Sequence, residues 1–331
     1  MIPIRRIVSL LPSLLLLAAC DLPSSIGDHT RIVAAIPQAQ REALEPAVAA
    51  ALEPRSFTVR NERIFDVAHV DPTSEDWVDF RKVRQVLVVG EAADPWVSPA
   101  LDRVDGAIPR APAVLQAQNV WARPQLVTIV LLPPGAQPSV AAERMPEVGQ
   151  LYVSQLEQYA RSRMFVSGEQ TQLADSLSRI AGFSLRIPRV YRTSEPEVGV
   201  FLFRNDQPDP SQLIRQVTVT RRPSVEVEMT PEAALQWRSE VAARTTTPPQ
   251  RTDSLQSGIT DLTVGDRPAV QAQGTWSNPP GDWPAAGPVI TRMVDCGQHT
   301  FLVDAWLYAP GRAKYEYMVQ LQTILDSFRC G

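Results

Sequence analysis

The sequence predicts an α+β fold of two layered α/β units, whose mainly antiparallel sheets are joined by a helical segment. Strand-like and helix-like segments alternate over residues 31–135 in the order β-α-β-β-α-β, which is typical of a sheet covered by helices. Residues 141–180 carry apolar side chains at helical spacing. Several segments after residue 182 alternate between polar and apolar residues, as half-buried antiparallel strands do.

Length and composition agree with this organisation. The chain has 331 residues, which suits two domains or one large one. Its 30 prolines are many, but 44% of the residues are hydrophobic, so we expect ordered domains joined by proline-rich loops. The formal net charge of -4 offers no positive field for nucleic acid, which we exclude as a partner.

The N-terminus is built like a bacterial export signal. The basic pair Arg5-Arg6 precedes an apolar stretch over residues 7–17, and the small pair Ala18-Ala19 comes directly before Cys20. A membrane-spanning helix is the alternative, but about 11 apolar residues are far fewer than the roughly 20 that a bilayer requires. We therefore predict a signal peptide that is cleaved before a lipid-acceptor cysteine.

This signal predicts where the protein resides. Residues 1–19 form the signal peptide, and residues 20–30 form the lipidated N-terminus and a short tether rich in Ser, Pro and Gly. Acyl chains such as palmitate on Cys20 would anchor the protein to a membrane of the bacterial cell envelope, with the folded part outside the cytoplasm. The choice between inner and outer membrane stays open.

The first α/β unit is predicted over residues 31–135. Its first helix carries Leu44, Val48 and Leu52 at a spacing of four, with Pro46 inside. The predicted strands cover residues 31–36, a hairpin over 57–70, 85–89 and 126–132; the predicted helices cover 38–52, 76–84 and 113–118.

The helical connection is predicted over residues 136–181, with Gly182 as its C-terminal cap, and the second unit over residues 182–331. Thr230 is the predicted N-cap of a helix that begins at Pro231. The predicted strands cover residues 183–188, 198–204 after a turn at 193–196, 216–219, 269–276, 289–295 and 300–307; a closing helix covers 314–328.

Two cysteines remain once Cys20 is assigned to lipid. Cys296 and Cys330 would lie in an oxidising compartment, so we predict a disulfide that closes a loop of roughly 35 residues and stabilises the fold by about 3–4 kcal/mol. Free redox-active thiols are the alternative, but no Cys-x-x-Cys spacing supports it.

The sequence predicts no catalytic, cofactor-binding or metal-ligating residues. The three histidines, His29, His69 and His299, share no ligand spacing, and no Gly-x-Ser-x-Gly motif occurs. Asp295 and Asp304 on neighbouring strands are candidates for a glycosidase pair, but solvated strand positions explain them better. We therefore expect no enzyme activity and no cofactor.

A set of arginines is the candidate for an anion site, although a soluble face balanced by Glu226 and Glu228 is the simpler interpretation. The set comprises Arg204, Arg215, Arg221 and Arg222.

The segment from Trp276 to Trp283 is the most unusual local feature. Two tryptophans bracket a turn rich in proline and glycine, and rigid aromatic side chains on a stiff loop suit peptide or glycan binding. The alternative is that both rings fold back and cover the sheet. We predict Trp276 and Trp283 as tentative ligand-binding residues.

The chain resembles the DUF4837 family of uncharacterised bacterial envelope lipoproteins over nearly all of its mature length. The segments that carry the resemblance are Ile32-Val33-Ala34, Leu52-Glu53-Pro54, Phe57-Thr58-Val59, Gly274-Thr275-Trp276, Gly287-Pro288, and Ala309-Pro310 through Lys314 into a final helix. The second half, through residues 182–188 and 324–328, also resembles Mog1/PsbP-like domains.

These resemblances imply a binding or structural role without catalysis. We predict a non-catalytic module that binds an envelope protein, peptide or glycan, or has a structural role. The alternative is an envelope hydrolase whose carboxylate catalysts the sequence does not identify.

Overall fold

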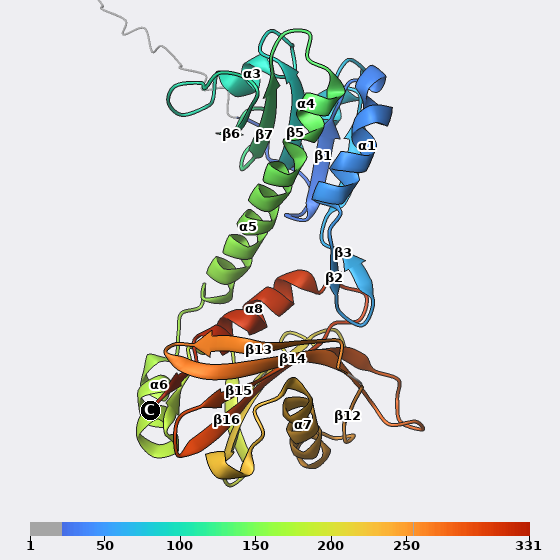
Figure 1. The fold of residues 1–331 in the computed structure, drawn as a ribbon. Coiled ribbons are helices and arrows are strands. Elements are labelled where there is room, and N and C mark those ends of the chain that lie inside the picture. The colour runs from blue at the N-terminus through green and yellow to red at the C-terminus, as the bar shows by residue number, and fades with distance from the viewer. Residues whose placement is uncertain (1–21, 254) are drawn as a thin grey trace, which may run out of the picture.

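The computed structural model describes residues 22–253 and 255–331 (Figure 1). The predicted signal peptide and the lipid acceptor Cys20 lie outside these residues. The fold class is the predicted α+β class, with two main sheets that each have their own core. The division into domains at residues 135 and 182 stays a prediction.

The first sheet has the strand order β4-β1-β5-β7-β6, and only the edge strand β6 runs antiparallel to its neighbour. This sheet is thus mostly parallel, in contrast to the antiparallel second sheet. Its strands are β4 (Asp66–Val70), β1 (Arg31–Ala35), β5 (Gln85–Glu91), β7 (Leu126–Leu132) and β6 (Ala113–Gln118).

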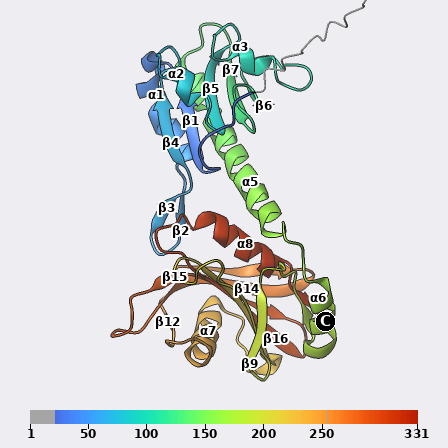
Figure 2. The ribbon, with the colours of Figure 1, turned by 180° about the vertical axis from the view of Figure 1, so that it is seen from behind.

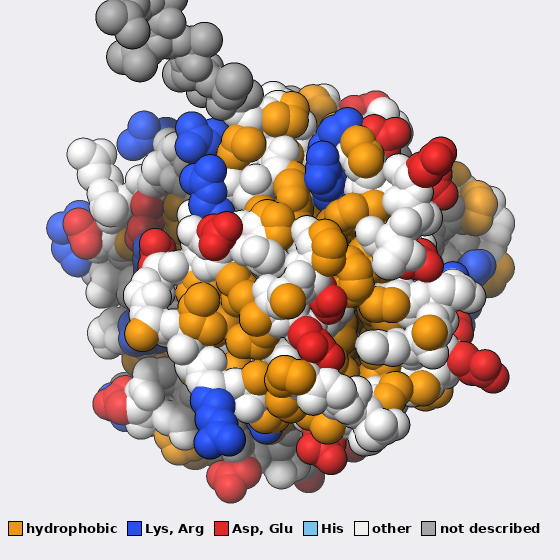
Figure 3. All heavy atoms as spheres, turned by 90° about the horizontal axis from the view of Figure 1, so that it is seen from above, with side chains coloured by type: hydrophobic (Ala, Val, Ile, Leu, Met, Phe, Trp, Pro, Cys, Tyr) orange, Lys and Arg blue, Asp and Glu red, His pale blue; other side chains and the backbone are white. Residues whose placement is uncertain are grey.

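Helices cover both faces of this sheet, which explains why strands such as β1 are apolar throughout. Ile32 and Ala34 face helices α1 (Gln38–Leu52) and α5 (Met145–Met164). Val33 and Ala35 face the short helices α2 (Trp77–Phe80) and α3 (Ser98–Leu101) on the other side. Seen from above, this end of the molecule shows apolar side chains across its centre and charged groups of both signs around them (Figure 3).

Two predictions in the first unit are wrong. Residues 113–118 form strand β6 and not a helix, because they pair with β7 as the edge of the sheet. The predicted hairpin over residues 57–70 is divided: β2 (Arg55–Phe57) and β3 (Asn61–Arg63) form a small hairpin, while β4 joins the main sheet.

Three helices connect the sheets: α4 (Pro138–Ala142), α5 and α6 (Thr171–Ala181). The 20 residues of α5 give it a length of about 30 Å, and it runs from the first sheet to helix α8 (Tyr315–Asp326) of the second unit (Figures 1 and 2). Gly182 ends α6 with φ +75°, as the C-cap prediction requires. Among the helices that the structure describes, none combines the length and apolarity needed to span a membrane.

The second sheet is antiparallel, with eight strands in the order β12-β14-β15-β16-β11-β10-β9 and β13 paired to β14. Helices α6 and α8 cover one face, and α7 (Pro231–Thr245) covers the other. Its strands are β9 (Arg192–Glu197), β10 (Val200–Asn205), β11 (Ile214–Pro223), β12 (Arg251–Thr252), β13 (Ser257–Val264), β14 (Arg267–Ser277), β15 (Ala286–Asp295) and β16 (His299–Tyr308).

Some predictions in the second unit also fail. The turn predicted at residues 193–196 belongs to the exposed edge strand β9, where Pro196 is tolerated because an edge need not donate every hydrogen bond. Strand β13 falls in a segment for which we predicted no strand, and its residues are almost all exposed. The strand predicted at residues 183–188 is only β8 (Phe183–Ser184).

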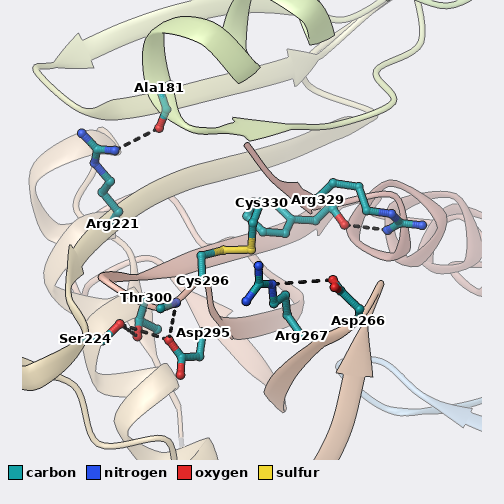
Figure 4. The surroundings of a disulfide bond; sticks show 12 residues. Ala181, Arg221, Ser224, Asp266, Arg267, Asp295, Cys296, Thr300, Arg329 and Cys330 are labelled. Atoms are coloured by element: carbon teal, nitrogen blue, oxygen red, sulfur yellow. Dashed lines mark hydrogen bonds and ion pairs between the residues drawn. A yellow bond between two sulfur atoms is a disulfide. The ribbon is translucent and has the colours of Figure 1, made fainter.

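The predicted disulfide between Cys296 and Cys330 is present, with a Cα–Cα distance of 5.7 Å (Figure 4). Cys296 follows β15, and Cys330 lies in β17 (Arg329–Cys330), which pairs with β8 after α8. The bridge therefore ties the end of the chain to the sheet.

Candidate functional site

A cavity of about 320 Å³ lies at one end of the antiparallel sheet, where β10, β14 and β16 meet the loop that follows α7. Its walls combine four aromatic side chains with hydroxyl, amide and guanidinium groups. The lining residues are Arg204, Ile214, Thr245, Thr246, Thr247, Pro248, Gln250, Trp276, Asn278, Trp283, Trp306 and Tyr308. Both tryptophans predicted from the sequence are among them.

Trp276 forms part of the rigid inner wall. Its side chain is only 2% exposed, and its ring packs edge-on against Trp306 at a centroid distance of 5.1 Å. The indole Nε1 donates a hydrogen bond of 3.1 Å to the carbonyl oxygen of Leu307. Gly287 lies opposite in the β14–β15 register, and a Cβ there would be 1.8 Å from that oxygen. Only glycine therefore leaves room for this tryptophan.

Trp283 lies at the mouth of the cavity and is 52% exposed. Its ring stands edge-on to Tyr308 at 5.6 Å, and its carbonyl oxygen accepts a hydrogen bond of 3.0 Å from Asn278 Nδ2. Gly281, at φ +97°, allows the turn between them. The two predicted residues thus have different roles in the structure: one is a buried wall, and the other is an accessible aromatic surface.

The opposite wall is polar and held by its own hydrogen bonds. Thr246 Oγ1 donates to the carbonyl oxygen of Ala242 and accepts from the amide of Gln250 at 2.8 Å. The Gln250 side-chain oxygen accepts from the buried guanidinium of Arg238. These bonds extend the end of α7 into a fixed loop beside the aromatic wall.

Arg204 brings a positive charge to the cavity, and it shares one carboxylate with a second arginine. Its Nε donates to Asp206 at 3.0 Å, and Arg192 binds the other carboxylate oxygen at 2.6 Å. Burial of Asp206 opposes its ionisation, yet the bonds and charges of both arginines hold the pKa of Asp206 below its usual range. The Arg204 guanidinium also lies 6.0 Å from the Trp306 ring centroid.

A buried ion pair supports this site from behind. Arg238 Nε lies 3.7 Å from Asp304 Oδ1, which also accepts a hydrogen bond of 2.6 Å from Thr291 Oγ1. Burial raises the pKa of Asp304, and the charge of Arg238 works against that rise. Both side chains are almost inaccessible to solvent, so the pair serves packing and not contact with a ligand.

The structure does not bring Asp295 and Asp304 together as a catalytic pair. Asp295 lies opposite Thr300, which is four residues from Asp304 on β16, about 13 Å along the strand. Glycosidase carboxylates are separated by roughly 5–9.5 Å. Asp295 instead accepts hydrogen bonds from Ser224 Oγ and the amide of Gly297.

The four candidate arginines do not converge either. Arg215 donates to Gln320, Arg221 donates to the carbonyl of Ala181, and Arg222 pairs with Glu240. Glu226 and Glu228 form no ion pair with them among the described residues. Within residues 22–253 and 255–331, no group of three or more His, Cys, Asp or Glu side chains is placed to hold a metal ion.

Sequence reasoning missed two aromatic residues of the cavity, Trp306 and Tyr308, and assigned Arg204 to an anion site and not to an aromatic cavity. The alternation of Trp306, Leu307 and Tyr308 at the end of a strand is the signal that was available, because it places both rings on the same face. Their proximity to Trp276 depends on the order of the strands, which the sequence pattern does not specify.

Residues 170–327 match the family model described as a domain of unknown function, DUF4837. No curated protein matches the sequence. The first-half segments that carry the predicted resemblance, such as Ile32-Val33-Ala34, lie outside the matched residues.

Three solved structures are similar to parts of the chain. The Ran-binding protein Mog1p of Saccharomyces cerevisiae has 9% identity and a TM-score of 0.33, covering 45% of this chain and 90% of its own. Cyanobacterial PsbP of Synechocystis has 12% identity and a TM-score of 0.33, covering 46% and 88%. A Bacteroides thetaiotaomicron protein has 10% identity and a TM-score of 0.27, and the match spans 45% of each chain. Mog1 and PsbP are thus among the similar structures, and the DUF4837 resemblance predicted from the sequence is confirmed over residues 170–327.

Proposed function

We propose that the protein is a non-catalytic binding module whose aromatic cavity holds sugar residues of a cell-envelope glycan. The observation that carries this proposal is the combination of an accessible ring, Trp283, with a buried aromatic wall and a polar wall of hydroxyl and amide groups. Sugars present apolar C–H faces and hydroxyl edges, so rings suit the faces and polar groups suit the edges. Most of the polar wall is neutral, which fits an uncharged ligand.

The chemistry of the lining favours binding over hydrolysis. None of the described residues that line the cavity is Asp or Glu, so a pair of carboxylates for general acid and base catalysis has no place there. The nearby Asp206 is engaged by two arginines. The alternative of an envelope hydrolase therefore has no supporting observation at this site.

The proposed location follows from the N-terminal sequence. We propose that Cys20 is lipidated after loss of residues 1–19, and that the anchor holds the module at a membrane of the cell envelope. Replacement of the acceptor by Cys20→Ser should release the protein into the soluble fraction after a salt wash. If this variant still sediments with membranes, the lipid is not what holds the protein.

Ligand binding is tested with soluble glycan fragments of the envelope, by NMR of the labelled protein. Trp283→Ala should reduce the affinity roughly tenfold, because a half-exposed ring contributes contact but little stability. Ile108→Ala is the matched control, since Ile108 is 48% exposed but does not line the cavity. If peptides bind and glycans do not, the ligand is a peptide and the glycan proposal is wrong. If Trp283→Ala and Ile108→Ala weaken binding equally, the aromatic cavity is not the binding site.

A further inference from the structure

A second and larger cavity, of about 480 Å³, lies in the first unit, beside the start of β5 and β7 and against α5. It does not share any lining residue with the aromatic cavity. Its walls are rich in side-chain amides and include two arginines. The amide residues are Gln85, Gln118, Asn119, Gln125, Gln155 and Gln158.

In two of these side-chain amides, the oxygen accepts no hydrogen bond from any described residue. Gln85 is only 5% exposed; its Nε2 donates to the carbonyl oxygen of His29, whereas its Oε1 has no hydrogen-bond partner among the described residues. Gln155 Oε1, on α5, is also buried and without such a partner. Neither oxygen is accessible from the cavity in this conformation, but both side chains line it, so a turn of either amide would present its oxygen there. Because buried acceptors are costly unless bonded, a ligand that brings hydroxyl or amine donors favours that turn.

Within the described part of the chain, the two arginines of the cavity are free to bind an anion. Arg84 and Arg123 both line it, and neither forms an ion pair with another described residue. Arg84 makes one hydrogen bond of 3.3 Å, to the carbonyl oxygen of Gly27, and Arg123 is exposed. Guanidinium groups bind phosphate through paired N–H donors, and both of these arginines line the same cavity.

The N-terminal segment brings the membrane close to this cavity. The amide of Arg123 donates to the carbonyl of Pro23 at 2.8 Å, and the amide of Ser25 donates to the carbonyl of Arg123 at 3.0 Å. Pro23 comes three residues after Cys20 in the sequence, so the chain between them can reach at most about 11 Å. A lipid on Cys20 would therefore hold the bilayer surface next to Arg123.

We infer that this cavity binds a phosphate ester that carries hydroxyl groups, with the phosphate on Arg84 and Arg123 and the hydroxyls donating to Gln85 and Gln155. The anionic glycerol headgroup of a phospholipid has this chemistry, and so does a free glycerol phosphate. The proposal that the ligand is a lipid headgroup rests on the proposed anchor at Cys20. The proposal that the cavity binds a phosphate ester does not depend on that anchor.

The experiment uses the full chain with Cys20→Ser, so that no acyl chain contributes to binding. Titration with glycerol phosphate and with inorganic phosphate should show that both bind. Arg84→Gln and Arg123→Gln should each weaken both ligands roughly tenfold. Gln155→Leu should weaken glycerol phosphate and leave inorganic phosphate unchanged, because only the former carries alcohol hydroxyl groups that extend beyond the phosphate and reach Gln155. Arg103→Gln, at an exposed arginine outside the cavity, is the matched control and should change nothing.

Vesicles distinguish the two sources. Sedimentation with phosphatidylglycerol-containing vesicles, but not with pure phosphatidylcholine vesicles, would support the headgroup. Binding of glycerol phosphate without vesicle binding would overturn the headgroup and support a soluble ester. Absence of glycerol phosphate binding, or equal weakening by Arg103→Gln, would overturn the site. Because these titrations use a chain without an anchor, they give the same answer if lipidation at Cys20 proves wrong.

Discussion

Replacing one tryptophan at a time should distinguish the buried wall residue Trp276 from the exposed residue Trp283 at the mouth of the aromatic cavity. Trp276→Ala removes a side chain that is 2% exposed, packed against Trp306, and hydrogen-bonded to Leu307. Loss of a buried aromatic ring costs about 3–5 kcal/mol, and the unpaired carbonyl adds about 1 kcal/mol. Trp283→Ala removes a ring that is 52% exposed, so the free energy of unfolding should fall by less than about 1.5 kcal/mol.

Urea unfolding followed by far-UV circular dichroism is the suitable assay, because the signal does not depend on the tryptophan that is removed. The midpoint for Trp276→Ala should fall by at least 1 M, taking a slope of about 3 kcal/mol/M. The midpoint for Trp283→Ala should change little while glycan affinity falls roughly tenfold. Equal midpoints for the two variants would refute the assignment of Trp276 to the core and Trp283 to the mouth.

Three other perturbations test the surrounding structure. Replacement of both Cys296 and Cys330 by alanine should lower the free energy of unfolding by about 3–4 kcal/mol, from a sequence separation of 34; an unchanged urea midpoint would contradict a bridge. Gly287→Ala should cost at least roughly 1–3 kcal/mol, since its Cβ would overlap a backbone oxygen; a wild-type melting curve would show that β15 can shift. Burial, with the charges of Arg84 and Arg163, lowers the pKa of His29, so the unfolded state takes up this proton first as pH falls below 6.5. Acidification towards pH 5 should therefore destabilise the protein, less so in His29→Gln, and identical pH profiles would reject this contribution.

Local patterns in the sequence predict many elements of the fold. Helix α1 has the predicted bounds Gln38–Leu52, because its buried apolar residues Leu44, Val48 and Leu52 recur at helical spacing. The N-cap at Thr230 is confirmed by the hydrogen bond that its Oγ1 accepts from Ala233, and the strands β15 and β16 extend the predicted segments by a few residues. In each case the signal lies within one element.

What the sequence does not show depends on partners far along the chain. Strand β6 consists of residues that are good helix formers, and pairing with β7 overrides that preference. The aromatic cavity requires that Trp276 and Trp306 become neighbours, and this follows from strand order and not from spacing. The two tryptophans near one turn were therefore a useful indication of the place, but not of which ring is exposed.

The long helix α5 has a consequence for the direction in which the aromatic cavity faces. A single helix between two bodies would leave them free to swivel about its axis, but here two lateral attachments oppose that rotation. Tyr315 Oη donates a hydrogen bond of 2.9 Å to Glu157 on α5, and Lys314 pairs with Glu62 on the β2–β3 hairpin. Since these contacts lie on different elements of the first unit, they fix both the rotation of the second unit about the α5 axis and its position along that axis. The aromatic cavity therefore keeps one fixed direction relative to the first unit. If the proposed lipid anchor holds the first unit at a membrane, a glycan lying along that membrane meets the cavity from one side only.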